Sequence, residues 1–262
     1  LKLPLTCIGI PKTVDNDLPI TDCSPGFGSV AKYVATSTLE AGLDVKSMSE
    51  TSTKVFILEV MGRHAGWIAA ASALASTNET DPPHIILMPE VPFAKKKFID
   101  KVKQTVANEG FCVVVASEGT RYKNGMFLAD SGLTDAFGHK QLGGVAPVLA
   151  QMISSIGLKN HWAVSDYLQR SARHISSKTD LDQAYAVGKK AVEFALAGKN
   201  AVMPVIKRLS DKPYKWKIES ASLSKVANVE KTLPKSYISK DGFTISSKGI
   251  DYLTPLIQGE PP

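Results

Sequence analysis

The fold is decided by residues 54–67, KVFILEVMGRHAGW, where an apolar run meets a glycine turn. The run at 54–60 is nearly continuous in apolar residues, which is typical of a strand covered on both faces. Residues 61–76, MGRHAGWIAAASALAS, turn sharply at Gly62 and then predict an alanine-rich helix. A buried strand that leads directly into a helix is the repeating unit of a parallel α/β sheet.

The same alternation extends in both directions. Strand-like and helix-like patterns follow one another, so we predict an α/β protein with a parallel sheet. Ser24 before Pro25 predicts the N-terminus of a helix that ends near Leu43, and Asp180 is the expected cap of a late helix. Strands are expected at 3–10, 84–90, 111–122, 201–209 and 214–223, and further helices at 95–110, from near Gly144 to 157, and at 180–198.

Composition narrows the class of protein. The 262 residues are 44% hydrophobic and 21% charged, as in ordinary globular domains, and the net charge is +6. Lysines are scattered without a basic arm, so we expect no nucleic-acid partner. The three cysteines form no CxxC pair, and no apolar run approaches the roughly 18 residues that span a bilayer. We expect a cytoplasmic protein without a membrane partner, in which an earlier segment is absent because the sequence starts inside a strand-like run without Met.

Ligands of parallel α/β sheets bind beyond the carboxyl ends of the strands. This rule selects four places in the sequence, each directly after a predicted strand. They are PKTVDND (11–17), MGRHAG (61–66), Pro89 with Glu90, and SEGTR (117–121).

The first place carries acid and base chemistry. Asp15 could accept a proton from an attacking hydroxyl, and Lys12 could neutralise a phosphate, as phosphoryl transfer requires. An Asx turn, in which the DND side chains cap the local backbone, is the alternative interpretation. Lys12 taken alone is more typical of a solvated surface charge.

Arginines mark two further phosphate candidates. Arg63 follows the Gly62 turn and could offer bidentate donors to an anion, or could lie along a packed helix. Arg170 stands near Tyr167 and Arg173, which suggests either a phosphate pocket or surface pairing. Glu118 ends an apolar strand, where it could accept hydrogen bonds from a polyhydroxy ligand or simply leave the sheet for water.

Three motifs in order, GIPKTVDNDLP (9–19), EVMGRHAGW (59–67) and YLQRSA (167–172), resemble the phosphofructokinase family, specifically its pyrophosphate-dependent branch. The similarity covers residues 1 to about 205. The resemblance implies two similar Rossmann-like lobes with parallel sheets, of which the N-terminal lobe is incomplete here. It also implies magnesium-dependent, reversible transfer of a phosphoryl group from pyrophosphate to the 1-hydroxyl of fructose 6-phosphate, giving fructose 1,6-bisphosphate in glycolysis.

The resemblance also assigns roles around the phosphoryl group. Asp15 becomes the catalytic base, and Thr13 helps to seat the substrate. Asp17 becomes a second carboxylate that influences the metal site, whose main ligand is expected upstream of residue 1. Lys12 stands where ATP-using relatives carry glycine, so it implies pyrophosphate as the donor. An ATP-dependent 6-phosphofructokinase and a non-catalytic, sugar-phosphate-binding regulatory subunit are the alternatives.

The sugar side follows in the same way. Met61, Gly62 and Arg63 match the family's sugar-contacting MGR, whose arginine also stabilises the transition state. The family's other contacts imply that Glu118 binds sugar hydroxyls, that Tyr167 and Arg170 hold the 6-phosphate, and that Lys54 reaches the sugar phosphate of a neighbouring subunit. Tyr167 replaces a histidine of the bacterial ATP enzymes. Because Lys54 would reach a neighbouring subunit, a homo-oligomer, dimer or tetramer, is expected.

The chain is expected to divide between the two lobes. Residues 1–18 would end the donor lobe, residues 19–165 would form the fructose 6-phosphate lobe, and residues 166–204 would return to the donor lobe. Residues 205–262 would form a C-terminal extension that packs across both.

Overall fold

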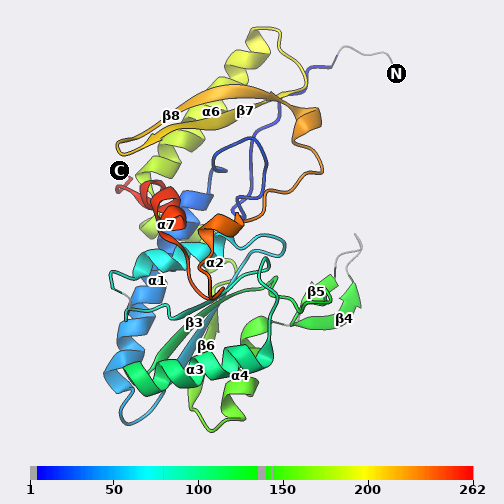
Figure 1. Ribbon diagram of the computed structural model, residues 1–262. Helices are drawn as coiled ribbons and strands as arrows, with labels where there is room; N and C mark the ends of the chain where they lie inside the picture. The colour runs from blue at the N-terminus through cyan, green and yellow to red at the C-terminus, as the bar shows by residue number, and fades with distance from the viewer. Residues whose placement is uncertain (1–4, 79, 135–139, 143, 262) are drawn as a thin grey trace.

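The computed structural model describes the chain except for residues 1–4, 79, 135–139, 143 and 262 (Figure 1). Its central feature is a four-stranded sheet in the order β2-β3-β1-β6, in which every pairing is parallel. The four strands are β1 (Val55–Val60), β2 (Ile85–Leu87), β3 (Cys112–Ser117) and β6 (Asn160–Val164). The parallel sheet predicted from 54–60 and its neighbours is thus confirmed, and β6 is a strand that the sequence patterns did not predict.

Helices cover both faces of this sheet, as the apolar run at 54–60 predicts. Val55 and Ile57 face a core shared with α3 and α4, whereas Leu58 and Val60 face a core shared with α1 and α2. Alternate residues of one strand therefore serve two cores, which explains why β1 shows no polar alternation. The four helices are α1 (Phe27–Met48), α2 (Trp67–Ala71), α3 (Lys95–Glu109) and α4 (Val145–Ser154).

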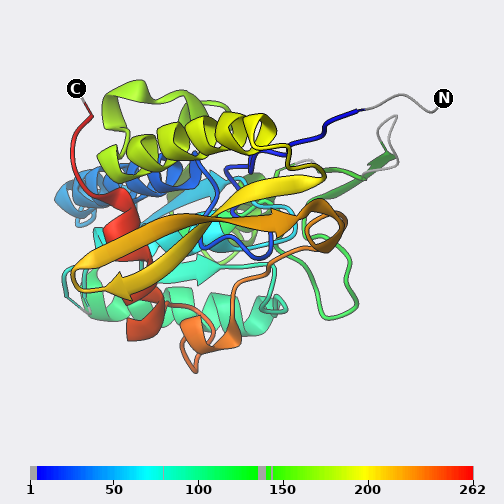
Figure 2. The same cartoon turned by 90° about the horizontal axis from the view of Figure 1, so that it is seen from above.

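A second layer lies above the first and is seen face-on in Figure 2. It consists of helix α6 (Lys178–Leu196) and an antiparallel hairpin of β7 (Val202–Asp211) and β8 (Tyr214–Ser222). The N-terminal segment runs beside the start of the hairpin, because Gly9 N donates to Val202 O over 2.9 Å. The strand predicted at 3–10 is reduced to one parallel bridge between Ile8 and Val202, and residues 1–4 lie outside the described part.

Shorter elements complete the chain. Strands β4 (Asp130–Thr134) and β5 (Lys140–Leu142) form a small antiparallel pair, and α7 (Ser247–Leu253) packs near α2. The predicted alanine-rich helix is short, because α2 passes into a 3₁₀ turn, η1. The short helices are α5 (Leu168–Ser171), η1 (Ser72–Ala75), η2 (Arg173–Ile175), η3 (Leu223–Lys225), η4 (Lys235–Tyr237) and η5 (Thr254–Ile257). Among the described residues, no helix combines the length and apolar content needed to cross a bilayer.

The predicted ends of α1 are wrong at both termini. The helix begins at Phe27, after Gly26 with φ of +102°, and the Ser24 hydroxyl has no hydrogen-bond partner among the described residues. At the other end the helix continues through Gly42 to Met48. A Cβ at position 42 would lie 2.5 Å from Pro82 Cγ, so this glycine permits close packing instead of ending the helix.

The predicted cap of α6 is also wrong. Ser177 is the N-cap, and its hydroxyl accepts a hydrogen bond from Asp180 N over 3.3 Å. The Asp180 carboxylate instead caps a different helix, since it accepts hydrogen bonds from Gly26 N and Ser29 N at the start of α1. A capping side chain chosen by local sequence can therefore serve a helix 150 residues away.

Candidate active site

The predicted site residues gather at one edge of the four-stranded sheet. Val60 at the end of β1 pairs with Ser117 at the end of β3, and Glu59 pairs with Val164 at the end of β6. The loops that follow these parallel strands therefore leave the sheet side by side. They carry Arg63 after β1, Glu118 after β3, and Tyr167 with Arg170 after β6.

The loops after β1 and β3 are locked together. Gly62 has φ of +125°, and its N–H donates to Glu118 Oε1 over 3.3 Å, while its carbonyl accepts from the Ser117 hydroxyl. A Cβ on Gly119 would lie 2.0 Å from Arg63 O, so the two loops touch at a point where only glycine fits. This role of Gly119 was not predicted from the sequence, although its position directly after Glu118 was a signal.

The DND segment turns on its central residue. Asn16 has φ of +57°, a left-handed conformation that asparagine tolerates better than most residues, and its side chain is fully buried. Its Oδ1 accepts from Ser24 N over 3.0 Å, and its Nδ2 donates to Tyr252 Oη over 3.0 Å. Asn16 therefore holds the turn through distant partners and not as an Asx turn, and Asp15 and Asp17 remain half-exposed on either side of it.

Thr13 fixes the orientation of Asp15. The Asp15 N–H donates to Thr13 Oγ1 over 3.1 Å, and the Thr13 hydroxyl donates to Asp15 Oδ2 over 3.3 Å. Lys12 is exposed at the entrance of the same turn. Thr13, which is predicted to help seat the substrate, thus also holds the carboxylate of the predicted base.

Electrostatics joins the DND segment to the sheet edge. Burial raises the pKa of the Asp15 carboxyl, and the neighbouring Asp17 charge raises it further, against the opposing effects of Thr13, Lys12 and His64. Burial also raises the pKa of the Glu118 carboxyl, which the Gly62 N–H and the Arg63 guanidinium oppose. Since the Asp15 charge also acts on Glu118, the carboxylates and cations of the two regions share one electrostatic environment.

The segment after β6 carries an exposed aromatic and cationic pair. The Arg170 guanidinium carbon lies 4.1 Å from the ring centroid of Tyr167. Tyr167 is 62% exposed. Gln169 between them is buried, and it accepts from Met61 N over 3.3 Å and donates to Asp166 O over 2.9 Å. Gln169 thus ties the predicted 6-phosphate segment to the MGR loop, a role that the sequence did not indicate.

Lys54 is not part of this cluster within the chain. Lys54 directly precedes β1, whereas Arg63 follows β1, so the two lie beyond opposite ends of this strand. Its Nζ donates to Ser49 O. A role for Lys54 at the site of a neighbouring subunit stays a prediction.

Two carboxylates support the loops, that of buried Glu59 and that of partly buried Glu90. Glu90 Oε1 accepts from Gly66 N over 3.0 Å and from Leu233 N over 2.8 Å, which explains why an acidic residue follows β2. Glu59 Oε2 accepts from Ala146 N over 2.7 Å and so caps α4, and burial raises the pKa of its carboxyl. A glutamate within an apolar strand was the available sequence signal for Glu59.

The residues of the described ranges form no group of three His, Cys, Asp or Glu side chains that could hold a metal ion by themselves. They do supply the Asp15 and Asp17 carboxylates at one turn. Mg²⁺ commonly takes one or two carboxylates together with substrate phosphates and water, so this donor pair is chemically compatible with that ion.

A hollow elsewhere on the surface does not compete with this cluster. A cavity of about 870 Å³ is lined by residues that include Asp81, His84, Lys101 and Asp241. None of the predicted site residues lines it. The sheet edge therefore remains the candidate active site.

Comparison with known proteins settles the family. The family described as phosphofructokinase matches residues 2–195, which is most of the chain. The chain belongs to the phosphofructokinase family. The fold predicted from the resemblance is confirmed by solved family members, and the three motifs that carried the resemblance fall within the matched range.

Close relatives belong to the pyrophosphate-dependent branch. A protein of Halomonas elongata, named pyrophosphate--fructose 6-phosphate 1-phosphotransferase, is 66% identical over 98% of this chain and 62% of its own length. The crystal structure of a pyrophosphate-dependent phosphofructokinase from Marinobacter aquaeolei superposes with a TM-score of 0.89 at 61% identity, over 98% of this chain and 62% of that one. The corresponding protein of Nitrosospira multiformis gives a TM-score of 0.90 at 57% identity, over 100% and 62%. The chain thus spans 62% of the length of these relatives.

Proposed function

We propose that the full-length protein transfers a phosphoryl group from pyrophosphate to the 1-hydroxyl of fructose 6-phosphate, giving fructose 1,6-bisphosphate, and that the reaction is reversible. The observation that carries this proposal is the DND turn, in which Thr13 orients the Asp15 carboxylate under the influence of the Lys12 charge. The names of the close relatives support the same reaction.

Asp15 is the proposed base. A raised pKa makes its carboxylate a stronger proton acceptor than an ordinary aspartate, and the Thr13 hydrogen bond aims it at the acceptor hydroxyl. Proton loss from the 1-hydroxyl gives the oxygen that attacks one phosphorus of pyrophosphate, the bridging P–O bond breaks, and orthophosphate leaves. Catalysis in such a transfer comes mainly from positioning and charge stabilisation, which Lys12 and Arg63 provide from two sides.

The sugar phosphate would bind along the sheet edge. Glu118 accepts hydrogen bonds from sugar hydroxyls, while the loop of Met61 and Gly62 borders the ring. Tyr167 and Arg170 take the 6-phosphate, and their exposure leaves the guanidinium available to a bidentate anion.

Magnesium is the expected cofactor. The Asp15 and Asp17 carboxylates are the groups of this chain that would face it, with Asp17 as an outer group. When bound, the ion would neutralise phosphate charge. Proton acceptance by Asp15 and charge stabilisation by Lys12 and Arg63 are roles of this chain's own side chains.

The donor is tested with the full-length protein. Initial rates are measured with fructose 6-phosphate and either pyrophosphate or ATP, each over a range of Mg²⁺ concentrations. Turnover with pyrophosphate and little with ATP supports the proposal. A preference for ATP would replace it with an ATP-dependent kinase, and sugar-phosphate binding without any turnover would replace it with a regulatory subunit.

A homo-oligomer is the proposed assembly, with a second copy of the chain on the free side of β6. Within the described residues β6 pairs with β1 alone, and Trp162 and Val164 on it are 47% and 42% exposed. Light scattering of the full-length protein should give a dimer or tetramer, and Trp162→Glu should lower that mass. A monomeric wild-type protein would refute the proposal.

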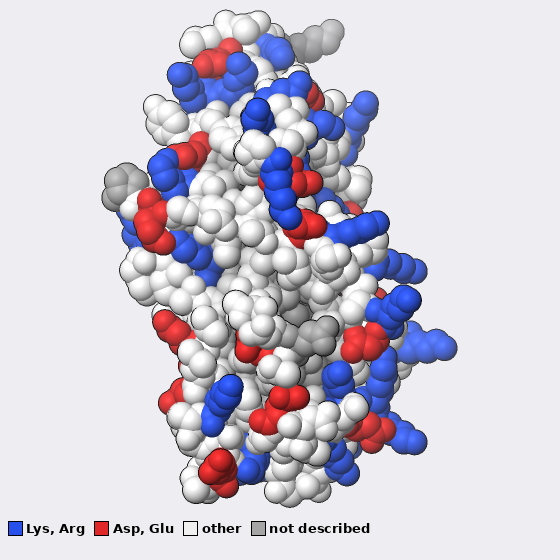
Figure 3. Space-filling view, turned by 60° about the vertical axis from the view of Figure 1, so that its left-hand side comes forward, with Lys and Arg blue, Asp and Glu red and all other residues white. Residues whose placement is uncertain are grey.

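The proposed division into lobes keeps residues 1–18 and 166–204 on the donor side and 19–165 on the sugar side. Pairing of the N-terminal segment with the start of β7 supports the grouping of the two donor segments. The proposed boundary after residue 204 falls inside β7, so the extension across the lobes would begin after the hairpin, near Leu223. Basic and acidic side chains are interspersed on the face in Figure 3, which supports a small-molecule substrate more than a nucleic-acid partner.

A further inference from the structure

Residues 230–233, here called the strap, lie between the two loops that carry the proposed catalytic groups. On one side, Lys231 N donates to Asp17 O over 2.6 Å. On the other side, Trp67 Nε1 donates to Lys231 O over 2.8 Å, and Leu233 N donates to the Glu90 carboxylate that also holds the loop after β1. The strap therefore connects the DND turn to the end of the MGRHAG loop through its own backbone.

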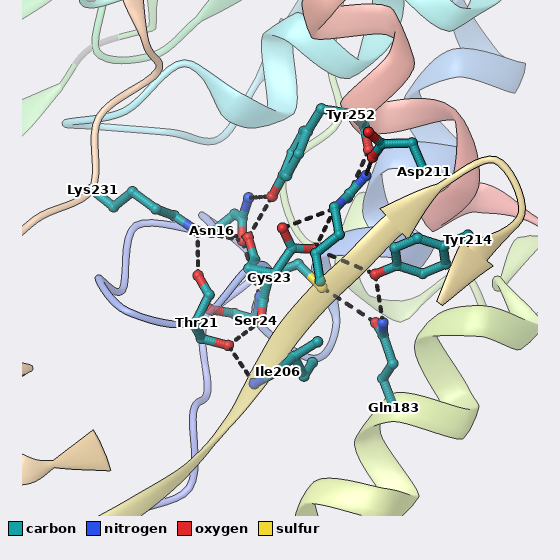
Figure 4. A network of polar contacts seen from close by, with 12 residues as sticks. Asn16, Thr21, Cys23, Ser24, Gln183, Ile206, Asp211, Tyr214, Lys231 and Tyr252 are labelled. Atoms are coloured by element: carbon teal, nitrogen blue, oxygen red, sulfur yellow. Dashed lines mark hydrogen bonds and ion pairs between the residues drawn. The ribbon is translucent and has the colours of Figure 1, made fainter. Parts of the chain in front are cut away.

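The side chain of Lys231 strengthens this connection. Its ammonium donates to Asp22 O over 2.9 Å, to Thr21 O over 3.1 Å and to Asn16 Oδ1 over 3.4 Å (Figure 4). The same nitrogen lies 5.2 Å from the ring centroid of Trp67. All three acceptors are neutral, and within the described residues the ammonium forms no ion pair with a carboxylate.

Burying an ammonium without an ion pair costs desolvation free energy, which its hydrogen bonds must offset. Three acceptors converge on one point behind the DND turn, and an ammonium has three donors to match them. Two of the acceptors are main-chain carbonyls and the third is the side chain that forms the centre of the turn. No uncharged side chain of similar length supplies three donors from one atom.

Tyr252 holds Asn16 from the opposite end. Its hydroxyl accepts from Asn16 Nδ2 over 3.0 Å and donates to Asp22 O over 2.6 Å. Asn16 is thus restrained at both ends of its amide, and Asp15 and Asp17 are its direct neighbours. Any movement of Asn16 would be transmitted to both carboxylates.

We propose that Lys231 is a positioning residue for phosphoryl transfer: it fixes the DND turn, and with it Asp15, relative to the loop that carries Arg63. The proposal rests on the proposed function for its kinetic consequence. Its structural consequence, restraint of residues 12–24, is independent of which reaction the protein catalyses.

The test compares Lys231→Met with Lys235→Met in the full-length protein. Methionine keeps most of the unbranched side chain but has neither donors nor a charge, whereas Lys235 is an exposed lysine two residues beyond the strap. We expect Lys231→Met to lower kcat on the order of 10²-fold, because small displacements of a reacting group have effects of this size. The KM for fructose 6-phosphate should change little, and Lys235→Met should behave as wild type.

Hydrogen exchange of backbone amides supplies the readout that does not depend on activity. In Lys231→Met, exchange of residues 12–24 should accelerate at least about tenfold, while exchange of β1 and β3 stays unchanged. Unchanged exchange of residues 12–24, or a loss of activity confined to KM, would overturn the proposal. If the wild-type protein does not use pyrophosphate, the proposed function fails, and the exchange result still decides the role of Lys231.

A second variant covers the case in which Lys231→Met does not fold. Trp67→Phe removes the indole N–H that binds Lys231 O and keeps an aromatic ring in the core. It should show the same pattern of faster exchange in residues 12–24, with a smaller amplitude. Folded Trp67→Phe with wild-type exchange in this segment would also overturn the proposal.

Discussion

The Asp180 carboxylate of α6 accepts a 2.6 Å hydrogen bond from the Ser29 hydroxyl of α1, which joins the first turns of two helices from different layers. The same carboxylate accepts from Gly26 N and Ser29 N. Asp180→Ala would leave these donors buried without acceptors, so we expect a loss of about 2 kcal/mol in the free energy of unfolding. Urea denaturation measures the change.

The matched control is Asp182→Ala on the same helix. Asp182 is exposed and pairs with Lys178 one turn away, and such surface pairs contribute about 0.5 kcal/mol or less. Equal losses from the two substitutions would contradict the capping role of Asp180.

Replacement of the proposed base tests the chemistry directly. Asp15→Asn keeps the size of the side chain and removes its ability to accept a proton, so kcat should fall on the order of 10³-fold. Binding of fructose 6-phosphate, measured by calorimetry, should be nearly unchanged. Near-normal turnover by this variant would exclude Asp15 as the base.

The acid side of the pH profile follows from the raised pKa of Asp15. The ionised carboxylate is the active form, so kcat/KM should fall as the pH drops through a value above the usual 3.8 of aspartate. Burial is the main cause and the Asp17 charge the second. Asp17→Asn should therefore shift the acid limb to lower pH, and the exposed Asp44→Asn should leave it in place.

Lys12 should control the choice of donor. Lys12→Gly removes an ammonium that would hold pyrophosphate and opens space beside Asp15, so the ratio of kcat/KM for pyrophosphate over ATP should fall on the order of 10²-fold. The ratio is measured with both donors under the same Mg²⁺ concentration. An unchanged ratio would show that the determinant of donor choice lies elsewhere.

Alanine at position 119 and alanine at position 188 should change the stability of the protein in opposite directions. Gly119→Ala would place a Cβ 2.0 Å from Arg63 O, so it should destabilise the fold and disturb the loop that carries Arg63. Gly188→Ala in α6 meets no atom within 4 Å and should stabilise the protein by about 0.5–1 kcal/mol. Thermal unfolding of both variants checks the signs, and a stable, fully active Gly119→Ala would contradict the close approach.

The sequence predicted the parallel sheet well because β1 and β3 are apolar on both faces, a pattern that few other structures share. It did not predict β6, since Asn160–Val164 is an exposed edge strand without an apolar run. It misplaced the start of α1 because Ser24 is a good local cap, whereas the actual acceptor, Asp180, is distant in sequence. Local patterns do not contain such long-range partners.

The candidate site also depends on partners that are distant in sequence and that local patterns do not contain. Arg63 and Glu118 could be proposed from the sequence because polar residues after the buried strands β1 and β3 stand out, whereas Asp15 follows a segment with a single bridge and was proposed from the DND pattern. Lys231 lies in a polar segment where one lysine looks like any other, and only the fold brings it behind the DND turn.

The strap has a consequence for the order in which the protein becomes competent during synthesis. Asn16 precedes Lys231 by 215 residues, so the DND turn leaves the ribosome long before the residue that is proposed to brace it. A ribosome-bound chain truncated ahead of the strap would present that turn without its final arrangement.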